Sequence, residues 1–150
     1  MNVIKEPNKI LHQKLSQVNS ITPALLSLID EMKKTMIATK GVGLSANQVG
    51  KNLRIFIIDQ NLAKENNTPE VYINPEMTGL SNKTQPVEEG CLSLPEYWPQ
   101  IKRPAKIWIK AMDEKGNKIK FRARGFLARV LQHEIDHLNG ILIKDKIKKE

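Results

Sequence analysis

Cysteine, aromatic residues and long hydrophobic runs are all scarce in this chain of 150 residues. The single cysteine, Cys91, excludes a framework of internal disulfide bonds and fits a reducing compartment. No apolar run approaches membrane-spanning length, and the N-terminal stretch MNVIKEPNKILHQKL lacks the apolar core of a signal peptide. We therefore expect a cytoplasmic protein without a membrane partner, with an organelle as the alternative compartment.

Acidic residues are also few relative to basic ones. Aspartate and glutamate number 16 against 24 lysines and arginines, which gives a formal net charge of +8. Such a balance favours contact with RNA or another polyanion, but a lysine-rich proteome explains it equally well. Because aromatic residues make up only 5% of the chain, we expect no stacking platform for single-stranded nucleic acid and no specific nucleic-acid partner.

The pattern of apolar residues predicts a mixed α and β structure. Thr22 and Pro23 are typical of a helix start, and apolar residues then recur at three- and four-residue spacing to about Lys40. The segments RIFIID and EVYINPEM have the composition of strands, and KIWIKAMD and KIKFRAR predict a hairpin that turns at Lys115-Gly116-Asn117. A further helix is expected to begin at Gly125.

The remaining segments are expected to be irregular. These are an N-terminal arm over residues 1–20, an exposed polar loop over 60–70 and a turn-rich stretch over 78–87. No repeat, low-complexity tract or linker interrupts the chain, and its length suits one hydrophobic core. We predict a single α+β domain spanning residues 1–150, with mostly antiparallel strands around the helix that follows Gly125.

That helix carries an H-E-x-x-H pattern in the sequence QHEIDHLNG. His133 and His137 are four residues apart, so both imidazoles project from one helix face and can reach the same metal ion. Glu134 lies at the flank of that face, where it can take a proton from water at the metal. Phe126 and Val130 share the face, so we expect the histidines to continue an apolar stripe into the interior. The alternative is an ordinary surface helix.

A catalytic metal of this kind normally has three protein ligands and one open position. Peptidases with the pattern H-E-x-x-H-x-x-G-x-x-H use a third histidine, but that position is Ile143 here, which cannot bind metal. Only thirteen residues follow His137, so we expect the third ligand upstream. The candidates are Cys91, His12 or a carboxylate, and Cys91 stands out because EGCLSLP is a tight turn ending in proline.

The segment GVGLSANQ, residues 41–48, is the other informative stretch. Two glycines on either side of Val42 let the backbone approach a ligand, and Gln48 offers both a donor and an acceptor. The segment contains neither G-K-[ST] nor G-x-G-x-x-G, so nucleotide binding is not expected. A plain structural turn is the alternative.

Taken in order, GVGLSANQ, EGCLSLP and QHEIDHLNG resemble the three motifs of the peptide deformylase family. Those motifs are G-φ-G-φ-A-A-x-Q, E-G-C-L-S-φ-P and Q-H-E-φ-D-H-L-x-G, and this chain departs from them at Ser45, where alanine is usual. The likeness runs from about residue 3 to residue 145. It implies a hydrolase that removes the formyl group from N-formylmethionine at the start of nascent polypeptides and releases formate.

The resemblance also implies a role for individual residues. Cys91, His133 and His137 would hold one divalent metal ion, with ferrous iron as the usual native ion and zinc, nickel or cobalt as substitutes. Glu134 would act as the general base. The side-chain amide of Gln48 and the backbone N–H of Leu92 would stabilise the developing oxyanion.

We expect an apolar pocket for the methionine side chain beside the metal. Phe126 and Val130 precede His133 on its helix face, and Val42 belongs to the glycine-rich segment. The backbone of Gly43 could pair with the peptide main chain as an added strand.

Two further features depart from the resemblance. Tyr97-Trp98-Pro99 stands where some members carry an arginine, and KDKIKKE leaves little room for the C-terminal helix through which some members touch the ribosome. The implied partners are the formylated nascent peptide and, transiently, the ribosome. The alternatives are a deformylase-like metalloprotein with an altered substrate range or no turnover, a zinc peptidase cutting internal bonds, and an RNA- or ribosome-binding module.

Overall fold

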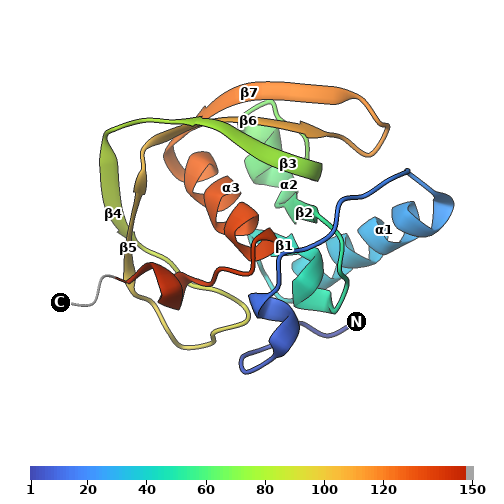
Figure 1. The fold of residues 1–150 in the computed structure, drawn as a ribbon, viewed down its shortest axis with the longest axis horizontal. Helices are drawn as coiled ribbons and strands as arrows, with labels where there is room; N and C mark the ends of the chain where they lie inside the picture. Colours follow the sequence, from blue (N-terminus) through green and yellow to red (C-terminus); the bar gives the residue numbers. More distant parts are fainter. Residues whose placement is uncertain (148–150) are drawn as a thin grey trace.

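Helix α3 (Gly125–Leu138) lies at the centre of the molecule, and the other elements pack around it (Figure 1). The computed structural model describes residues 1–147. A five-stranded sheet has the order β1-β2-β3-β6-β7, with every neighbouring pair antiparallel. Its strands are β1 (Gly43–Ser45), β2 (Ile55–Ile58), β3 (Val71–Leu80), β6 (Lys106–Met112) and β7 (Lys118–Arg124). The predicted α+β fold with mostly antiparallel strands around this helix is confirmed.

The other elements complete the layers around the helix. A separate two-stranded sheet pairs β4 (Thr84–Glu88) with β5 (Gln100–Pro104). The remaining helices are α1 (Pro23–Ala38), α2 (Gln60–Glu65) and the 3-10 helices η1 (Lys9–His12), η2 (Ala46–Val49) and η3 (Ile143–Lys146). None of the helices within residues 1–147 is long and apolar enough to cross a membrane.

Local sequence signals explain the elements that were predicted. Thr22 caps α1 because its hydroxyl accepts a hydrogen bond from Leu25 N at 3.1 Å, and Pro23 occupies the first helical turn. Between β6 and β7, the Asp113 carboxylate accepts hydrogen bonds from Lys115 N and Asn117 N, each 2.9 Å long. The hairpin register runs from Lys106 opposite Arg124 to Met112 opposite Lys118.

The expected loop over residues 60–70 was wrong in its first half. Asp59 caps α2 by accepting a hydrogen bond from Leu62 N at 3.1 Å, and Leu62 and Ala63 are buried. A six-residue helix is too short to show a periodic apolar pattern, so the capping aspartate was its main signal.

The turn-rich stretch over residues 78–87 was also partly wrong. Strand β3 continues to Leu80, and β4 begins at Thr84 and pairs with β5. Four of the five β4 residues are exposed, so the strand lacks the apolar alternation that would reveal it.

The N-terminal arm is irregular, apart from η1, but it is not a free surface segment. Leu11, Leu15 and Val18 are buried. The arm also forms backbone hydrogen bonds with all three motif segments: Ile4 N donates to Gln48 O, Glu6 N to Ser93 O, and Leu15 N to Leu138 O, at 2.6, 3.0 and 2.8 Å. The path of the arm across the base of the molecule is visible in Figure 1.

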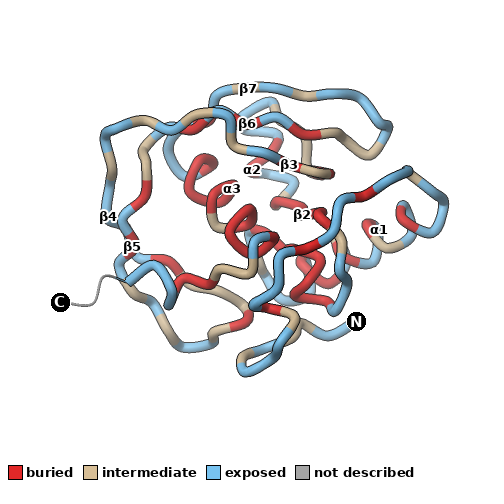
Figure 2. The backbone as a smooth tube through the Cα atoms, in the orientation of Figure 1, coloured by how far each residue is buried: buried red, intermediate tan, exposed pale blue. Residues whose placement is uncertain are grey.

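The hydrophobic core fills the space between α3, α1 and the inner face of the large sheet. All four residues of β2 are fully buried, and Phe56 stacks on Tyr72 of β3 with ring centroids 4.7 Å apart. Figure 2 shows that much of α3 and all of β2 are buried. Each buried isoleucine or leucine stabilises the fold by about 1.5–3 kcal/mol before chain entropy is counted, so this core fixes the helix that carries the histidines.

Candidate metal centre

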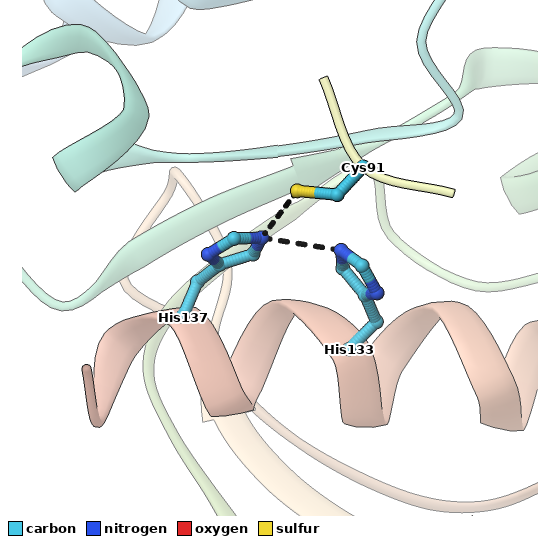
Figure 3. Close-up of side chains that lie close together, drawn as sticks. All are labelled: Cys91, His133 and His137. Atoms are coloured by element: carbon cyan, nitrogen blue, oxygen red, sulfur yellow. Dashed lines mark hydrogen bonds between the residues drawn. The ribbon is translucent and has the colours of Figure 1, made fainter. Parts of the chain in front are cut away.

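Three side chains from two distant segments converge above helix α3 (Figure 3). Cys91 Sγ lies 3.3 Å from His137 Nε2, which lies 3.1 Å from His133 Nε2. Among residues 1–147, these are the histidine, cysteine and acidic side chains that could jointly hold a metal ion, with ligand atoms within 4.8 Å of one another. His12 is not part of the cluster, because it lies at the surface and pairs with Glu6 at 2.5 Å.

The spacing of these atoms fits a shared metal ion. Tetrahedral ligands at metal distances of ~2.0–2.3 Å are separated from one another by roughly 3.3–3.6 Å. The distances from His137 Nε2 to Cys91 Sγ and to His133 Nε2, 3.3 and 3.1 Å, are close to this range, and all three ligand atoms lie within 4.8 Å of one another. The donors are one thiol sulfur and two imidazole nitrogens, a set that suits zinc, iron and related divalent ions. All three point toward one position, as Figure 3 shows.

The electrostatic surroundings also fit a cation. Burial lowers the pKa of His137 well below its usual value, so this imidazole stays in the neutral form that binds metal. Burial acts in the same direction on His133, but hydrogen bonds to Cys91 and Glu89 and the charge of Glu134 outweigh it and raise its pKa to about 10. The pKa values of the two histidines shift in opposite directions because the pair shares one proton, which stays on His133 beside the surrounding anionic groups. A divalent ion would satisfy the same anionic groups.

A buried ionic network orients His133 from behind. Glu89 Oε1 accepts a hydrogen bond from His133 Nδ1 at 3.1 Å, which directs Nε2 toward the cluster. The same carboxylate accepts from Arg103 Nε at 2.6 Å, from Arg103 Nη2 at 3.0 Å and from Arg129 Nη1. Arg103 Nη1 also donates to Asp136 Oδ2 at 2.7 Å. Burial alone would raise the pKa of Glu89, but His133 and Arg103 outweigh it and hold the pKa at about 2.

Sequence reasoning missed this network. Glu89 and Asp136 lie inside two of the motifs, so their positions beside Cys91 and His137 were an available signal. Arg103 and Arg129 have no comparable local pattern, because their role depends on β5 and α3 meeting in space.

Glu134 lies within the same pocket and is 3% exposed. Its Oε1 has no hydrogen-bond partner among residues 1–147, and burial raises the pKa of its carboxyl to about 7. A Cβ atom at Gly43 would lie 2.6 Å from Glu134 Oε2, which is too close for any side chain. Gly43, at the start of β1, therefore leaves room for this carboxylate as well as for a ligand.

Gln48 and Leu92 approach the cluster from the side of Cys91. Gln48 Nε2 lies 3.7 Å from Cys91 Sγ and 3.1 Å from Ser93 Oγ. Its Oε1 accepts a hydrogen bond from Ser45 N at 3.1 Å and lies 3.1 Å from Ser45 Oγ. The serine that departs from the family motif thus contacts the Gln48 amide and helps to hold its orientation.

A cavity of about 660 Å³ opens beside these groups. It is lined by every predicted site residue except His137, which lies behind the cavity and is 1% exposed: Val42, Gly43, Gln48, Cys91, Leu92, Phe126, Val130, His133 and Glu134. One part of the prediction was wrong. Phe126 does not belong to a stripe that leads into the interior; it is 58% exposed and stands at the rim, because it lies in the first turn of α3.

Trp98 is a second large aromatic residue on the cavity lining and was not predicted as a site residue. It is 66% exposed, and its ring lies so close to Gly90 that a Cβ atom there would be 2.2 Å from Trp98 Cζ3. From the segment Tyr97-Trp98-Pro99, Trp98 therefore forms part of the cavity wall, where the resemblance led us to expect an arginine in some relatives.

Comparisons with known proteins agree with the three motifs. The family model for polypeptide deformylase matches residues 1–150. The peptide deformylase of Mesorhizobium japonicum is 43% identical over 145 residues, covering 95% of this chain and 81% of the relative. That of Thermodesulfovibrio yellowstonii is 42% identical over 147 residues, covering 98% and 88%.

Solved structures show the same fold. The crystal structure of peptide deformylase from Thermotoga maritima has a TM-score of 0.91 and 36% identity, with 99% of this chain and 97% of that chain covered. The structure from Synechococcus elongatus, in complex with actinonin, has a TM-score of 0.92 and 34% identity, with coverage of 100% and 80%. Since sequence and fold both match over nearly the whole length, this chain belongs to the peptide deformylase family of enzymes.

Proposed function

We propose that this enzyme removes the formyl group from N-formylmethionyl nascent polypeptides and releases formate. The observation that carries the proposal is the convergence of Cys91, His133 and His137 beside the buried, unpartnered carboxylate of Glu134. The free thiol at this position would need a reducing compartment, so we also propose that the enzyme works in the cytoplasm.

Cys91, His133 and His137 would hold one divalent ion, with ferrous iron as the proposed native ion. When bound, the ion supplies Lewis acidity, which polarises the formyl carbonyl and lowers the pKa of a water molecule. The protein's own contribution is to fix the three donors. Glu89 holds the Nδ1 side of His133, and the surrounding arginines keep that carboxylate charged and in place.

Glu134 would move the proton during the reaction. The water oxygen forms a bond to the formyl carbon while a proton passes to the Glu134 carboxylate. The carbon–nitrogen bond then breaks, and the same proton passes to the amine nitrogen of the leaving peptide. The immediate products are formic acid and a free amino terminus. Formic acid then ionises to formate and its proton protonates the amine, so atoms and charge balance without any further reactant.

Gln48 and Leu92 would stabilise the oxyanion that develops on the formyl oxygen. The amide oxygen of Gln48 is engaged by Ser45, so its NH₂ group faces Cys91 and Ser93. The Leu92 backbone N–H is the second proposed donor, and Leu92 lines the cavity. Oriented donors of this kind lower the barrier because they need no reorganisation when charge develops.

The apolar wall of the cavity would accept the methionine side chain. Val42, Leu92, Phe126 and Val130 all line it. Gly43 begins β1, which is the terminal strand of the large sheet, so a peptide could add to its open edge through main-chain hydrogen bonds. This arrangement suits a chain terminus better than an internal peptide segment.

The decisive experiment is to purify the protein anaerobically, load it with ferrous iron, and measure formate release from a formyl-Met peptide. We expect turnover on the formylated peptide and no cleavage of its unformylated counterpart. Cleavage of internal peptide bonds would support the zinc-peptidase alternative. A metal-replete protein that releases no formate would overturn the proposal in favour of a deformylase-like protein without turnover.

A further inference from the structure

The outer face of the β6–β7 hairpin is strongly basic. Alternate residues of β6 and β7 are buried or half-buried against the core, and the residues between them are exposed on the opposite face. We name the exposed set the basic sheet face; it comprises Lys106, Trp108 and Lys110 of β6 and Lys118, Lys120, Arg122 and Arg124 of β7. Figure 2 shows β7 running along the outside of the molecule with mostly exposed residues.

Cations on this face lie directly opposite one another. Lys110 pairs with Lys120 in the ladder, and Lys106 pairs with Arg124. Like charges directly opposite each other destabilise a sheet. Within residues 1–147, the only salt bridge from these side chains joins Lys110 to Glu76 at 3.4 Å. The face therefore concentrates positive charge that the rest of the described chain does not neutralise.

Protection of a sheet edge explains only part of this pattern. Lysines on an edge strand discourage pairing with another chain, and β7 is such an edge. Strand β6, however, lies between β3 and β7, so Lys106 and Lys110 guard no edge. Binding of an external polyanion would explain the exposed cations on both strands.

An aromatic side chain lies in the middle of this face. Trp108 is 38% exposed and sits opposite Arg122 in the ladder. On its other side it contacts Gly79 of β3, where a Cβ atom would lie 3.2 Å from Trp108 Cε3. The glycine gives the indole room to lie over the sheet. The low aromatic content led us to expect no stacking platform, but it does not reveal that Trp108 lies among cations, where a nucleic-acid base can stack.

A groove of about 510 Å³ runs beside β7 and adds uncharged polar groups. Asn67 and Thr68 line it together with the residues of β7. Amide and hydroxyl groups at this position can bond to ribose hydroxyls, whereas the cations suit phosphates. Trp108 is the one large apolar side chain of the basic sheet face, so the face offers little apolar area to a bilayer, which disfavours a membrane surface.

We propose that the basic sheet face binds single-stranded RNA without sequence preference. Successive exposed residues on a strand are about 6.7 Å apart, so β7 offers a regular row of cations to a phosphate backbone. Trp108 provides the stacking contact, and the groove contacts the sugar. None of these residues lines the cavity beside the metal ligands, so the proposal does not depend on the proposed function.

The test is fluorescence anisotropy with a short labelled oligouridine RNA, using the metal-loaded protein at salt concentrations between about 50 and 200 mM. Lys120→Ser/Arg122→Ser is compared with Lys9→Ser/Lys51→Ser, which removes the same charge from exposed positions outside the basic sheet face and its groove. We expect the first variant to weaken binding about ten-fold or more and to reduce the salt slope by roughly 1.4, since each phosphate contact contributes about 0.7. The second variant should change binding by less than about two-fold.

Trp108→Leu separates stacking from charge. It should weaken binding about five-fold or more while leaving the salt slope nearly unchanged, because stacking on an aromatic ring adds affinity but releases no counterions. Unchanged melting temperature and formate release would show that each variant is folded. Equal weakening by both double variants would overturn the proposal, as would undetectable binding, equal affinity for the matching DNA, or tighter binding to anionic lipid vesicles.

Discussion

The Oε1 atom of the Glu134 carboxylate has no hydrogen-bond partner among residues 1–147, and the other oxygen, Oε2, faces Gly43. Leaving a buried polar atom unsatisfied costs about 1–3 kcal/mol, so a structural role alone does not explain this carboxylate. We predict that Glu134→Gln will bind metal normally and lose activity by at least roughly 100-fold in kcat, because glutamine keeps the shape but cannot carry the proton.

The measurement is kcat for formate release together with metal content. A Glu134→Gln enzyme with a normal metal content and near-normal kcat would remove Glu134 from the proposed mechanism. An equal loss of metal and activity would instead indicate that Glu134 supports the metal ligands.

At the residue scale, chemistry was easier to predict than exposure. The spacing of His133 and His137 fixes a shared helix face, and the scarcity of thiols drew attention to Cys91. Phe126 shares that face, but its exposure depends on where the helix begins relative to the surrounding strands, which its spacing does not reveal. The space beside Gly43 could not be foreseen either, because its neighbour Glu134 is distant in sequence.

At the element scale, Glu89 connects three parts of the chain. It links the segment that carries Cys91 to β5 through Arg103 and to α3 through Arg129 and His133. We predict that Glu89→Gln will weaken metal binding by about 10–100-fold, as expected when the group behind a metal-binding histidine is changed. The unfolding free energy should fall by about 3–5 kcal/mol, because buried guanidinium groups lose their partner.

Glu76→Gln is the matched control, since Glu76 forms an exposed salt bridge with Lys110. That change should alter stability by less than about 1 kcal/mol and leave metal affinity unchanged. Isothermal titration with metal and denaturant unfolding measure the two effects. If Glu89→Gln binds metal as tightly as the parent protein, Glu89 does not position His133.

Element predictions succeeded where a pattern repeated and failed where it was too short. Helix α1 and the β6–β7 hairpin each extend over enough residues to show their period. Helix α2 and strand β4 are too short to show a period, so their structure depends on the segments that they pack against. The ion network was not predicted, because its members are distant in sequence. Arg103 and Arg129 become partners of Glu89 only when β5 packs against α3.

At the scale of the whole molecule, Tyr72 links stability to alkaline pH. Burial raises the pKa of its hydroxyl from 10.0 to about 12, with only slight opposition from Thr68. The unfolded chain therefore loses this proton first, so the contribution to stability is complete below pH 10 and is lost as the pH rises toward 12. By pH 12 the loss amounts to about 3 kcal/mol for a shift of this size.

Tyr72→Phe should remove this part of the pH dependence. The Tyr72 hydroxyl makes no hydrogen bond to residues 1–147, so the variant should be as stable as the parent at neutral pH, or slightly more stable. Chemical denaturation of both proteins between pH 9 and pH 12 is the measurement. Parallel curves over that range would show that Tyr72 is not the group responsible.

The metal is expected to stabilise the whole fold, because its ligands come from α3 and from the distant Cys91 segment. A ligand present at about 1,000 times its Kd adds about 4 kcal/mol to the unfolding free energy. We predict that a chelator will lower the melting temperature of the parent protein but not that of Cys91→Ser, since a serine hydroxyl rarely ionises to bind metal. Equal responses to the chelator would mean that the ion lies elsewhere.

The arm formed by the first twenty residues has a consequence for how the protein is made. Ile4, Glu6 and Leu15 bond to the backbone of Gln48, Ser93 and Leu138, so the arm pairs with segments that follow much later in the sequence. Contacts of such long sequence separation form late and slow folding. The arm cannot complete its hydrogen bonds, nor can the three motifs be held together by it, until translation has passed α3. An enzyme proposed to act on unfinished polypeptides would thus be inactive itself until that helix has been made.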